Sequence, residues 1–361
     1  MVSLVFLLTL WVQSAFHILP ETPLTGYEPL PKADTLTLDG WSEGSWQQHM
    51  ERAEAKTFGF RPAVVRLVNQ LRYSFFNEHT DVLTRAEDGT LFENAYRNSV
   101  CGSDFIGDSL VEVRLDSLDH FQNYLASQGK KMVILITPNK WRTFSERVDW
   151  DCQTGMTNYE AFIPTIRHRG YAVCDAIDIF QYDQTNEPEH ALHSKQGTHW
   201  SIFGAALSLD YLSYAFAEEG IILPRVSFDT VEVVDEPRYT DKDLHDLLNV
   251  MLGPRDEELA YPKLSFSGGY KPKTLVIGDS YYWTYYYLGA HEGLFAPGSK
   301  FFYYNRDIYT DNSKDRTPLT DDLRLQALDE AEVVLLVMSE PSLARFGYDA
   351  FRLTPEVEQK D

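Results

Sequence analysis

The chain has few cysteines, and these point to no chemistry of their own. Cys101, Cys152 and Cys174 are the only three among 361 residues, and they show neither C-x-x-C spacing nor a metal-binding pattern. In an oxidising compartment one disulfide is possible, which leaves one free thiol. The sequence does not fix the pair, and three reduced core thiols are equally compatible with it. None of the three is a convincing nucleophile.

Positive charge is also scarce. The chain has 32 Lys and Arg against 54 Asp and Glu, a formal net charge of −22. This balance excludes nucleic acid as a partner, because phosphate binding needs a basic surface. It also disfavours an anionic polymer, unless a local groove is basic. No H-E-x-x-H pattern, clustered metal ligands or phosphate-binding glycine loop occurs, so we expect neither a metal nor a cofactor.

The N-terminus contains no Lys or Arg before Lys32. Residues 2–19 form an apolar run long enough to span a bilayer or to serve as the core of a signal peptide. No A-x-A cleavage site follows, so an uncleaved anchor at 1–19 is favoured, with a buried N-terminal helix as the alternative. Residues 20–42 are rich in Pro, Gly, Thr and Asp and predict a tether, which leaves residues 43–361 as one catalytic domain.

Apolar, strand-like segments alternate with helical periodicity along the rest of the chain. Such alternation indicates one α/β domain with a mostly parallel, doubly wound sheet and helices on both faces. A hairpin is expected around Gly89. The expected strands are 132–138, 171–180, 226–234, 274–280, 301–305 and 333–338, and the expected helices lie within 45–77, 110–127, 158–168 and 201–219.

The segment TLVIGDS predicts a nucleophile, because an apolar strand runs directly into Gly278, Asp279 and Ser280. Ligand sites lie at the carboxyl ends of parallel strands. A glycine there allows a sharp turn, and nearby backbone N–H groups can stabilise an oxyanion. We expect Gly278 and Asp279 to form this turn and the oxyanion site. A second GDS, at 107–109, follows no strand and is expected to begin a helix.

His199 is the candidate base for Ser280. It lies in THW just before a predicted helix that Ser201 caps, and a serine hydroxyl is a weak nucleophile until a base takes its proton. Weaker candidates for substrate binding follow other strands or adjoin the nucleophile. They are Asn139, Lys140, Tyr281, Trp283, Asn305 and Arg306.

Together these motifs resemble the SGNH-hydrolase-like polysaccharide O-acetyltransferases of the alginate AlgJ/AlgX-like family. The resemblance covers essentially the whole chain, and the His motif precedes the Ser motif, the permuted order of this group. It implies an SGNH-hydrolase-like (flavodoxin-like) fold. The matching motifs are FGFR at 58–61, DGTLF at 88–92, ITPNK at 136–140, THW at 198–200, DLLNVMLG at 246–253 and GDS at 278–280.

One position departs from this family. Its best-known members have Asp-x-His-Trp, in which the Asp orients the histidine, and this chain has Gly197 there. Either a backbone carbonyl or another acid, such as Asp175 or Asp178, orients His199, or the enzyme is slower.

The resemblance implies O-acetylation of an extracellular polysaccharide through a Ser280 acetyl-enzyme. It also implies a membrane-anchored, periplasmic or otherwise extracytoplasmic location at the inner membrane, and an MBOAT-type membrane partner that supplies acetyl groups. Two alternatives remain open. The first is a carbohydrate esterase with the same Ser280 and His199, and the second is a non-catalytic polysaccharide-binding subunit.

Overall fold

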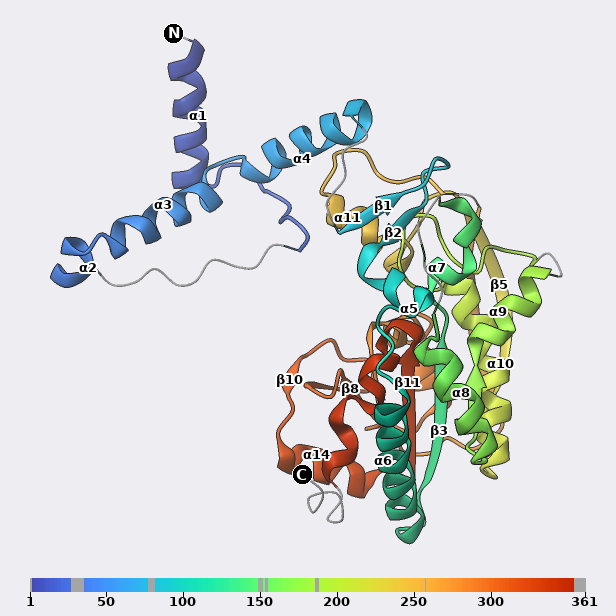
Figure 1. Cartoon of the computed structure of the whole chain (residues 1–361). Coiled ribbons are helices and arrows are strands. Elements are labelled where there is room, and N and C mark those ends of the chain that lie inside the picture. Colours follow the sequence, from blue (N-terminus) through green and yellow to red (C-terminus); the bar gives the residue numbers. More distant parts are fainter. Residues whose placement is uncertain are drawn as a thin grey trace. The chain divides into compact units, whose positions relative to one another are not determined.

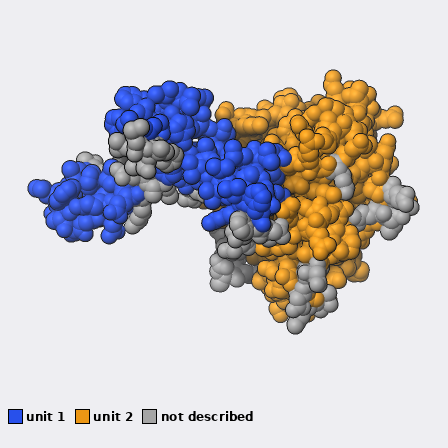
Figure 2. Space-filling model, turned by 90° about the horizontal axis from the view of Figure 1, so that it is seen from above, with its two compact units in different colours: residues 1–80, 245–253 blue, residues 81–244, 254–361 orange. Residues whose placement is uncertain are grey.

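A computed structural model of the chain shows two compact units (Figures 1 and 2). Unit 1 comprises residues 1–80 and 245–253, and unit 2 comprises residues 81–244 and 254–361. Segment 43–80, expected in the catalytic domain, thus groups with the N-terminal residues. The structure describes residues 2–26, 36–76, 82–148, 152, 155–185, 188–256 and 258–353.

Unit 1 is helical. The expected N-terminal helix is present as α1, but no helix among the described residues is long and apolar enough to cross a membrane. Part of the expected tether, 27–35, lies outside the described residues, and its last residues form α2. The helices are α1 (Val2–Phe16), α2 (Leu38–Ser42), α3 (Ser45–Thr57), α4 (Arg61–Leu71) and the short π-helix η1 (Arg72–Phe76).

Unit 2 is built on a seven-stranded sheet in the order β10-β9-β8-β7-β11-β3-β4. The five strands from β8 to β4 are parallel to their neighbours, whereas β9 returns antiparallel to β8 and β10 pairs antiparallel with β9. The prediction of a mostly parallel sheet is confirmed. The strands are β3 (Lys131–Thr137), β4 (Val173–Asp175), β7 (Thr274–Gly278), β8 (Lys300–Tyr303), β9 (Asp307–Thr310), β10 (Thr317–Pro318) and β11 (Val333–Ser339).

Successive residues of the central strands point to opposite faces, so each strand contributes to two cores. In β3, Val133 and Leu135 belong to one apolar cluster, while Ile134 and Ile136 belong to the other. The first core is covered by α9, α10, α12 and α13 and the second by α6, α8, α14 and η6, which confirms helices on both faces. Their bounds are α6 (Asp108–Ser127), α8 (Asn158–His168), α9 (Ala176–Thr185), α10 (Ile202–Glu218), α12 (Trp283–Tyr287), α13 (Ala290–Leu294), α14 (Asp321–Glu330) and η6 (Glu340–Leu353).

Two expected strands differ from the prediction. Segment 171–180 is a strand only over β4, because Asp175 accepts a hydrogen bond from the Ile177 N–H (3.1 Å) at the start of α9. Segment 226–234 is a strand, β5 (Arg225–Val234), but it pairs only with β6 (Leu259–Ser267), in a separate antiparallel ribbon. An alternating pattern identifies a strand but not its partner. The expected hairpin around Gly89 is formed by β1 (Leu83–Arg85) and β2 (Leu91–Glu93).

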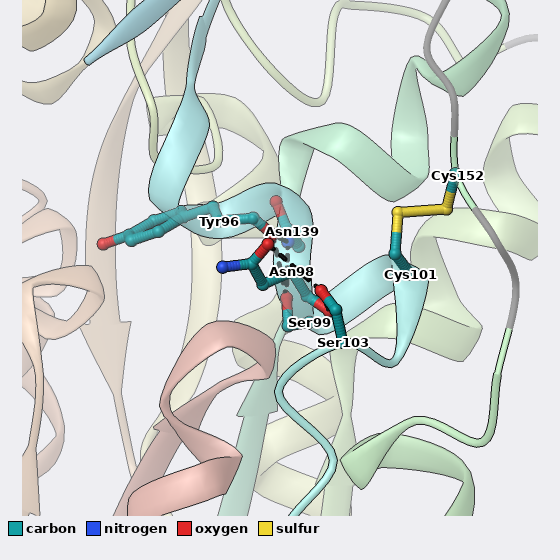
Figure 3. Close-up of a disulfide and its surroundings, with 7 residues drawn as sticks. All are labelled: Tyr96, Asn98, Ser99, Cys101, Ser103, Asn139 and Cys152. Carbon is teal, nitrogen blue, oxygen red and sulfur yellow. Dashed lines mark hydrogen bonds between the residues drawn. A yellow bond between two sulfur atoms is a disulfide. The ribbon is translucent and has the colours of Figure 1, made fainter. Parts of the chain in front are cut away.

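A disulfide joins Cys101 to Cys152 with their Cα atoms 5.5 Å apart, and Cys174 is a buried free thiol (Figure 3). Cys101 ends α5 (Arg97–Cys101), which follows the short 3-10 helix η2 (Asn94–Tyr96). The Asn139 side chain, just after β3, donates to the Tyr96 carbonyl (2.7 Å) and to the Ser99 hydroxyl (2.9 Å). The disulfide therefore constrains α5, which Asn139 hydrogen-bonds to the carboxyl end of β3.

The disulfide should contribute measurably to stability. Because 51 positions separate the two cysteines, we expect reduction to cost about 2–5 kcal/mol of unfolding free energy. Reductant should lower the Tm of the wild type but leave that of a Cys101→Ser/Cys152→Ser double variant unchanged. Equal Tm values for the wild type with and without reductant, together with three titratable thiols in the unfolded, unreduced protein, would contradict the pairing.

Candidate active site

Three side chains form one hydrogen-bonded line at the carboxyl end of the sheet. His199 Nε2 lies 2.8 Å from Ser280 Oγ, and His199 Nδ1 lies 2.5 Å from Asp243 Oδ2. Ser280 is half-buried and His199 is buried. The structure thus brings the two predicted residues together and adds an acid at the start of α11 (Asp243–Leu248). A serine, a histidine and a carboxylate in this order can activate the hydroxyl for acyl transfer.

Ser280 occupies its place because β7 ends in Gly278. A Cβ on Gly278 would come within 2.8 Å of Val337 Cβ on the neighbouring strand β11, so only glycine permits this close packing. The chain then enters the 3-10 helix η5 (Ser280–Tyr282), which continues as α12. The amide of Ser280 therefore lies at the N-terminus of a helical segment, where backbone N–H groups can face an oxyanion.

Asp279 fixes this turn. Its Oδ1 accepts from the Tyr281 N–H (3.1 Å), and its Oδ2 accepts from the Ser339 N–H (2.9 Å) and the Tyr348 hydroxyl (2.8 Å). The side chain is buried. Asp279 thus joins the end of β7 to the end of β11 and positions the nucleophile.

His199 is held from two sides. Its ring lies edge to face with that of Tyr281, with the centroids 4.6 Å apart, and the Tyr281 hydroxyl donates to the Thr198 carbonyl (3.2 Å). After His199 and Trp200, Ser201 caps α10 by accepting from the Gly204 N–H (2.9 Å). These contacts fix the imidazole where a helix begins.

Asp243 is the functional candidate that the sequence did not identify. Its Oδ1 accepts from the Thr198 N–H (2.8 Å) while Oδ2 contacts the imidazole. The suggestion of Asp175 or Asp178 is wrong, because both carboxylates bind Arg167, and Asp175 also accepts from Tyr159. Asp243 lies 44 positions after His199, so no local motif links the two.

Gly197 explains how Asp243 reaches the histidine. A Cβ at this position would lie 2.3 Å from the Thr240 carbonyl oxygen and 2.9 Å from the Asp241 carbonyl carbon. The backbone of the segment that carries Asp243 therefore occupies the space that a side chain at 197 would need. The missing family aspartate and the presence of Asp243 are two consequences of one packing arrangement.

The charges around His199 favour its protonated form. Burial lowers the pKa of His199. The negative charge of Asp243 and its hydrogen bond raise this pKa, and the charges of Asp279 and Glu93 raise it further. The resulting pKa of His199 lies above the ordinary value of 6.5. Burial raises the pKa of neighbouring Asp241 to about 8. This shift favours the neutral form of Asp241, and the carboxylate that contacts the imidazole is that of Asp243.

Asn139, Lys140 and Tyr281 were expected to contact substrate, but all three are buried. The Lys140 Nζ donates to the carbonyls of Leu91, Lys195 and Gly197 at 2.7, 2.9 and 2.7 Å. Burial lowers the pKa of Lys140 to about 7. Lys140 thus ties the β1–β2 hairpin to the segment before His199, and Asn139 and Tyr281 position other elements in the same way.

Trp283 is half-buried and packs against four aromatic rings, with centroids 4.7 Å from that of Tyr309 and 5.3 Å from that of Phe301. This placement makes it a packing residue. Asn305 and Arg306, in contrast, line a cavity of about 380 Å³ together with Tyr304. Burial raises the pKa of Tyr304, and a hydrogen bond with Ser280 opposes this rise. The cavity therefore adjoins the nucleophile, and Tyr304 is a second residue that sequence reasoning missed.

Restoring the family aspartate should damage this site. We expect Gly197→Asp to reduce cleavage of a chromogenic acetyl ester by at least about a hundredfold, because the new side chain displaces the segment that carries Asp243. Gly253→Asp is the matched control, since a Cβ there meets nothing within 4 Å. Full activity in Gly197→Asp would contradict this account.

The pH profile tests the role of Asp243. His199 must be neutral to accept a proton, so a raised pKa places the acid limb of kcat/KM above pH 6.5, with activity rising as pH increases through it. Without the carboxylate, burial dominates and the pKa falls. We expect Asp243→Asn to move the acid limb to lower pH and to reduce kcat by about 10²–10⁴-fold. An unmoved limb would exclude this role.

Comparison with known proteins gives one match to a family model. Residues 83–261 match the family model described as "SGNH hydrolase-like domain, acetyltransferase AlgX". The matched range contains His199 and Asp243 and ends before Ser280. Comparison with curated proteins gives no significant sequence match.

Solved structures with similar folds include three from bacteria. The O-acetyltransferase domain of Pseudomonas putida AlgJ is 15% identical, with 76% of this chain and 96% of that chain covered and a TM-score of 0.47. Bacillus cereus PatB1 is 12% identical, with 76% and 100% covered and a TM-score of 0.47. Pseudomonas aeruginosa AlgX is 15% identical, with 79% and 70% covered and a TM-score of 0.47. Residues 83–261 of this chain are thus similar to the SGNH hydrolase-like domain of AlgX-type acetyltransferases.

Proposed function

We propose that this chain is an O-acetyltransferase that modifies an extracellular polysaccharide through an acetyl-enzyme on Ser280. The observation that carries the proposal is the line of hydrogen bonds from Ser280 through His199 to Asp243. It lies in a chain whose residues 83–261 are similar to the SGNH hydrolase-like domain of AlgX-type acetyltransferases.

In the first step Ser280 Oγ attacks the carbonyl carbon of an acetyl donor while its proton passes to His199 Nε2. The imidazolium that forms is stabilised by the Asp243 carboxylate at Nδ1. The Ser280 N–H stabilises the tetrahedral oxyanion, and Tyr304, beside Ser280, is suited to do the same with its neutral hydroxyl. Collapse expels the donor group, which takes the proton from His199.

In the second step a sugar hydroxyl gives its proton to His199 and attacks the acetyl carbon. The bond to Ser280 Oγ breaks, and the serine recovers its proton from the imidazolium. If water attacks in place of the sugar, the same residues act as a carbohydrate esterase. The nature of the second nucleophile therefore separates the leading function from this alternative.

The cavity beside Tyr304 is the proposed acceptor site. It contains three arginines and one carboxylate, Asp349, which lies 3.6 Å from Arg114. Arg324 is held by Asn305 and Asp321. Among the described residues, Arg306 and Arg345 have no carboxylate partner, and both are exposed. The cavity is thus the local basic groove that a chain of net charge −22 needs to bind an acidic sugar. Its lining residues are Tyr304, Asn305, Arg306, Arg324, Arg345, Tyr348 and Asp349.

We further propose an extracytoplasmic location. The Cys101–Cys152 disulfide supports it, because such bonds persist in oxidising compartments and are rare in the cytosol. An MBOAT-type membrane partner that delivers acetyl groups, and anchoring through residues 1–19, remain parts of the proposal that rest on the family resemblance.

The test is detection of the acetyl-enzyme. The full chain, incubated with a chromogenic acetyl ester, should gain one acetyl group on Ser280, detectable by mass spectrometry. We expect no adduct in Ser280→Ala, and none that forms or turns over in His199→Ala. Ser109→Ala, in the other GDS tripeptide, is the matched control and should behave as the wild type. A folded wild type without adduct or ester cleavage would favour the binding-subunit alternative.

Acceptor oligosaccharides then separate transfer from hydrolysis. Acetylation of an acidic oligosaccharide in preference to a neutral one is expected. Arg306→Ala and Arg345→Ala should reduce transfer to the acidic acceptor more than transfer to the neutral one. Release of acetate with no acetylated sugar would favour the esterase.

A further inference from the structure

The helix α4 and the adjoining π-helix η1 have an apolar face that no described residue of unit 1 covers. Large apolar side chains recur here at spacings of three and four residues, the pattern of a helix that normally faces a core. Their exposed fractions nevertheless run from 36% to 76%. The residues of this face are Val64, Leu67, Val68, Leu71 and Phe75.

The opposite, polar face of α4 is turned toward the rest of unit 1. Asn69 Nδ2 donates to the Leu248 carbonyl (2.8 Å), and Gln70 Oε1 accepts from the N–H groups of Met251 (3.0 Å) and Leu252 (2.9 Å). The Arg66 guanidinium donates to the carbonyls of Thr22 (2.9 Å) and Pro23 (2.7 Å). These bonds fix the rotation of α4, so its apolar face is directed away from the rest of unit 1.

The charge of this segment is opposite to that of the chain. Residues 58–76 contain Arg61, Arg66 and Arg72 and no Asp or Glu, although acidic residues outnumber basic ones 54 to 32 overall. A basic amphipathic helix is typical of proteins that lie on anionic membrane surfaces.

A second apolar surface belongs to the same unit. Helix α1 exposes Val5, Leu8, Trp11 and Phe16. It crosses Gly59 so closely that a Cβ there would lie 2.4 Å from the Leu10 carbonyl oxygen. Unit 1 therefore exposes large apolar side chains on α1 and on the α4–η1 segment, among them the aromatic Trp11, Phe16 and Phe75. Exposed apolar surface of this kind marks interaction sites.

We propose that α4 lies flat in the interface of a lipid bilayer that contains anionic lipids. Its apolar face enters the boundary between headgroups and acyl chains, and the positive charges of Arg61, at the start of α4, and Arg72, at the start of η1, favour negative headgroups. A second copy of the chain is a poorer occupant, because it would bring two arginine-rich segments of like charge together. This proposal does not depend on the acetyl-transfer reaction.

The test compares vesicle binding by full-length variants. The wild type should sediment with vesicles of phosphatidylcholine and phosphatidylglycerol more than with phosphatidylcholine alone, and added salt should reduce the difference. Leu67→Ser/Leu71→Ser should lower the partition coefficient for the mixed vesicles about tenfold or more, because two apolar side chains no longer enter the bilayer. Both residues are already 45–49% exposed, so the fold should tolerate the changes.

The matched control is Leu110→Ser/Leu325→Ser, which removes two helical leucines of 41% and 47% exposure from unit 2. Its vesicle binding should equal that of the wild type. Thermal unfolding and the oligomeric state are measured in parallel for every variant. If Leu67→Ser/Leu71→Ser binds vesicles as the wild type does, the proposal is overturned. In that case a lower Tm would indicate burial against the protein, and a lost dimer would indicate a second copy.

Discussion

The candidate site depends on the approach of one backbone segment to Gly197. The Thr240 carbonyl occupies the position next to this glycine, and this contact sets Asp243 against the imidazole of His199. Lys140 also supports the arrangement, because its buried Nζ donates a hydrogen bond to the Gly197 carbonyl. The acid that orients His199 therefore comes from a segment distant in the sequence, and Gly197 leaves the space in which this segment packs.

The sheet supplies the other half of the site. Its two apolar cores hold β3, β7 and β11 in parallel, so the chain segments that follow them meet at one edge. Asp279 fixes the geometry of this edge. Its carboxylate accepts hydrogen bonds from the N–H groups of Tyr281 and Ser339, and so joins the ends of β7 and β11. A nucleophile on a strand end and a base at a helix start are thereby held within hydrogen-bonding distance.

Several residues that were selected from sequence motifs as substrate-binding candidates have a structural role. Asn139 and Lys140 follow a strand, as many binding residues do, yet their polar atoms are used by backbone carbonyls and by the Ser99 hydroxyl. Asn305 and Arg306 follow a strand in the same way and line a cavity. The two cases differ in what packs against these residues: Asn139 meets the segment held by the Cys101–Cys152 disulfide, and Lys140 meets the β1–β2 hairpin and the segment before His199.

Local pattern by itself determined the alternation of helices and strands and the mostly parallel sheet, and it selected Ser280 and His199, whose side chains lie within hydrogen-bonding distance. These features depend on side-chain period and on the residues at strand ends, which neighbouring positions encode. Only the tertiary structure decided that β5 leaves the main sheet, that Asp243 orients His199, and that α4 turns its apolar face away from the rest of unit 1. Each of these depends on contacts between segments far apart in the chain, and periodicity carries no information about such contacts.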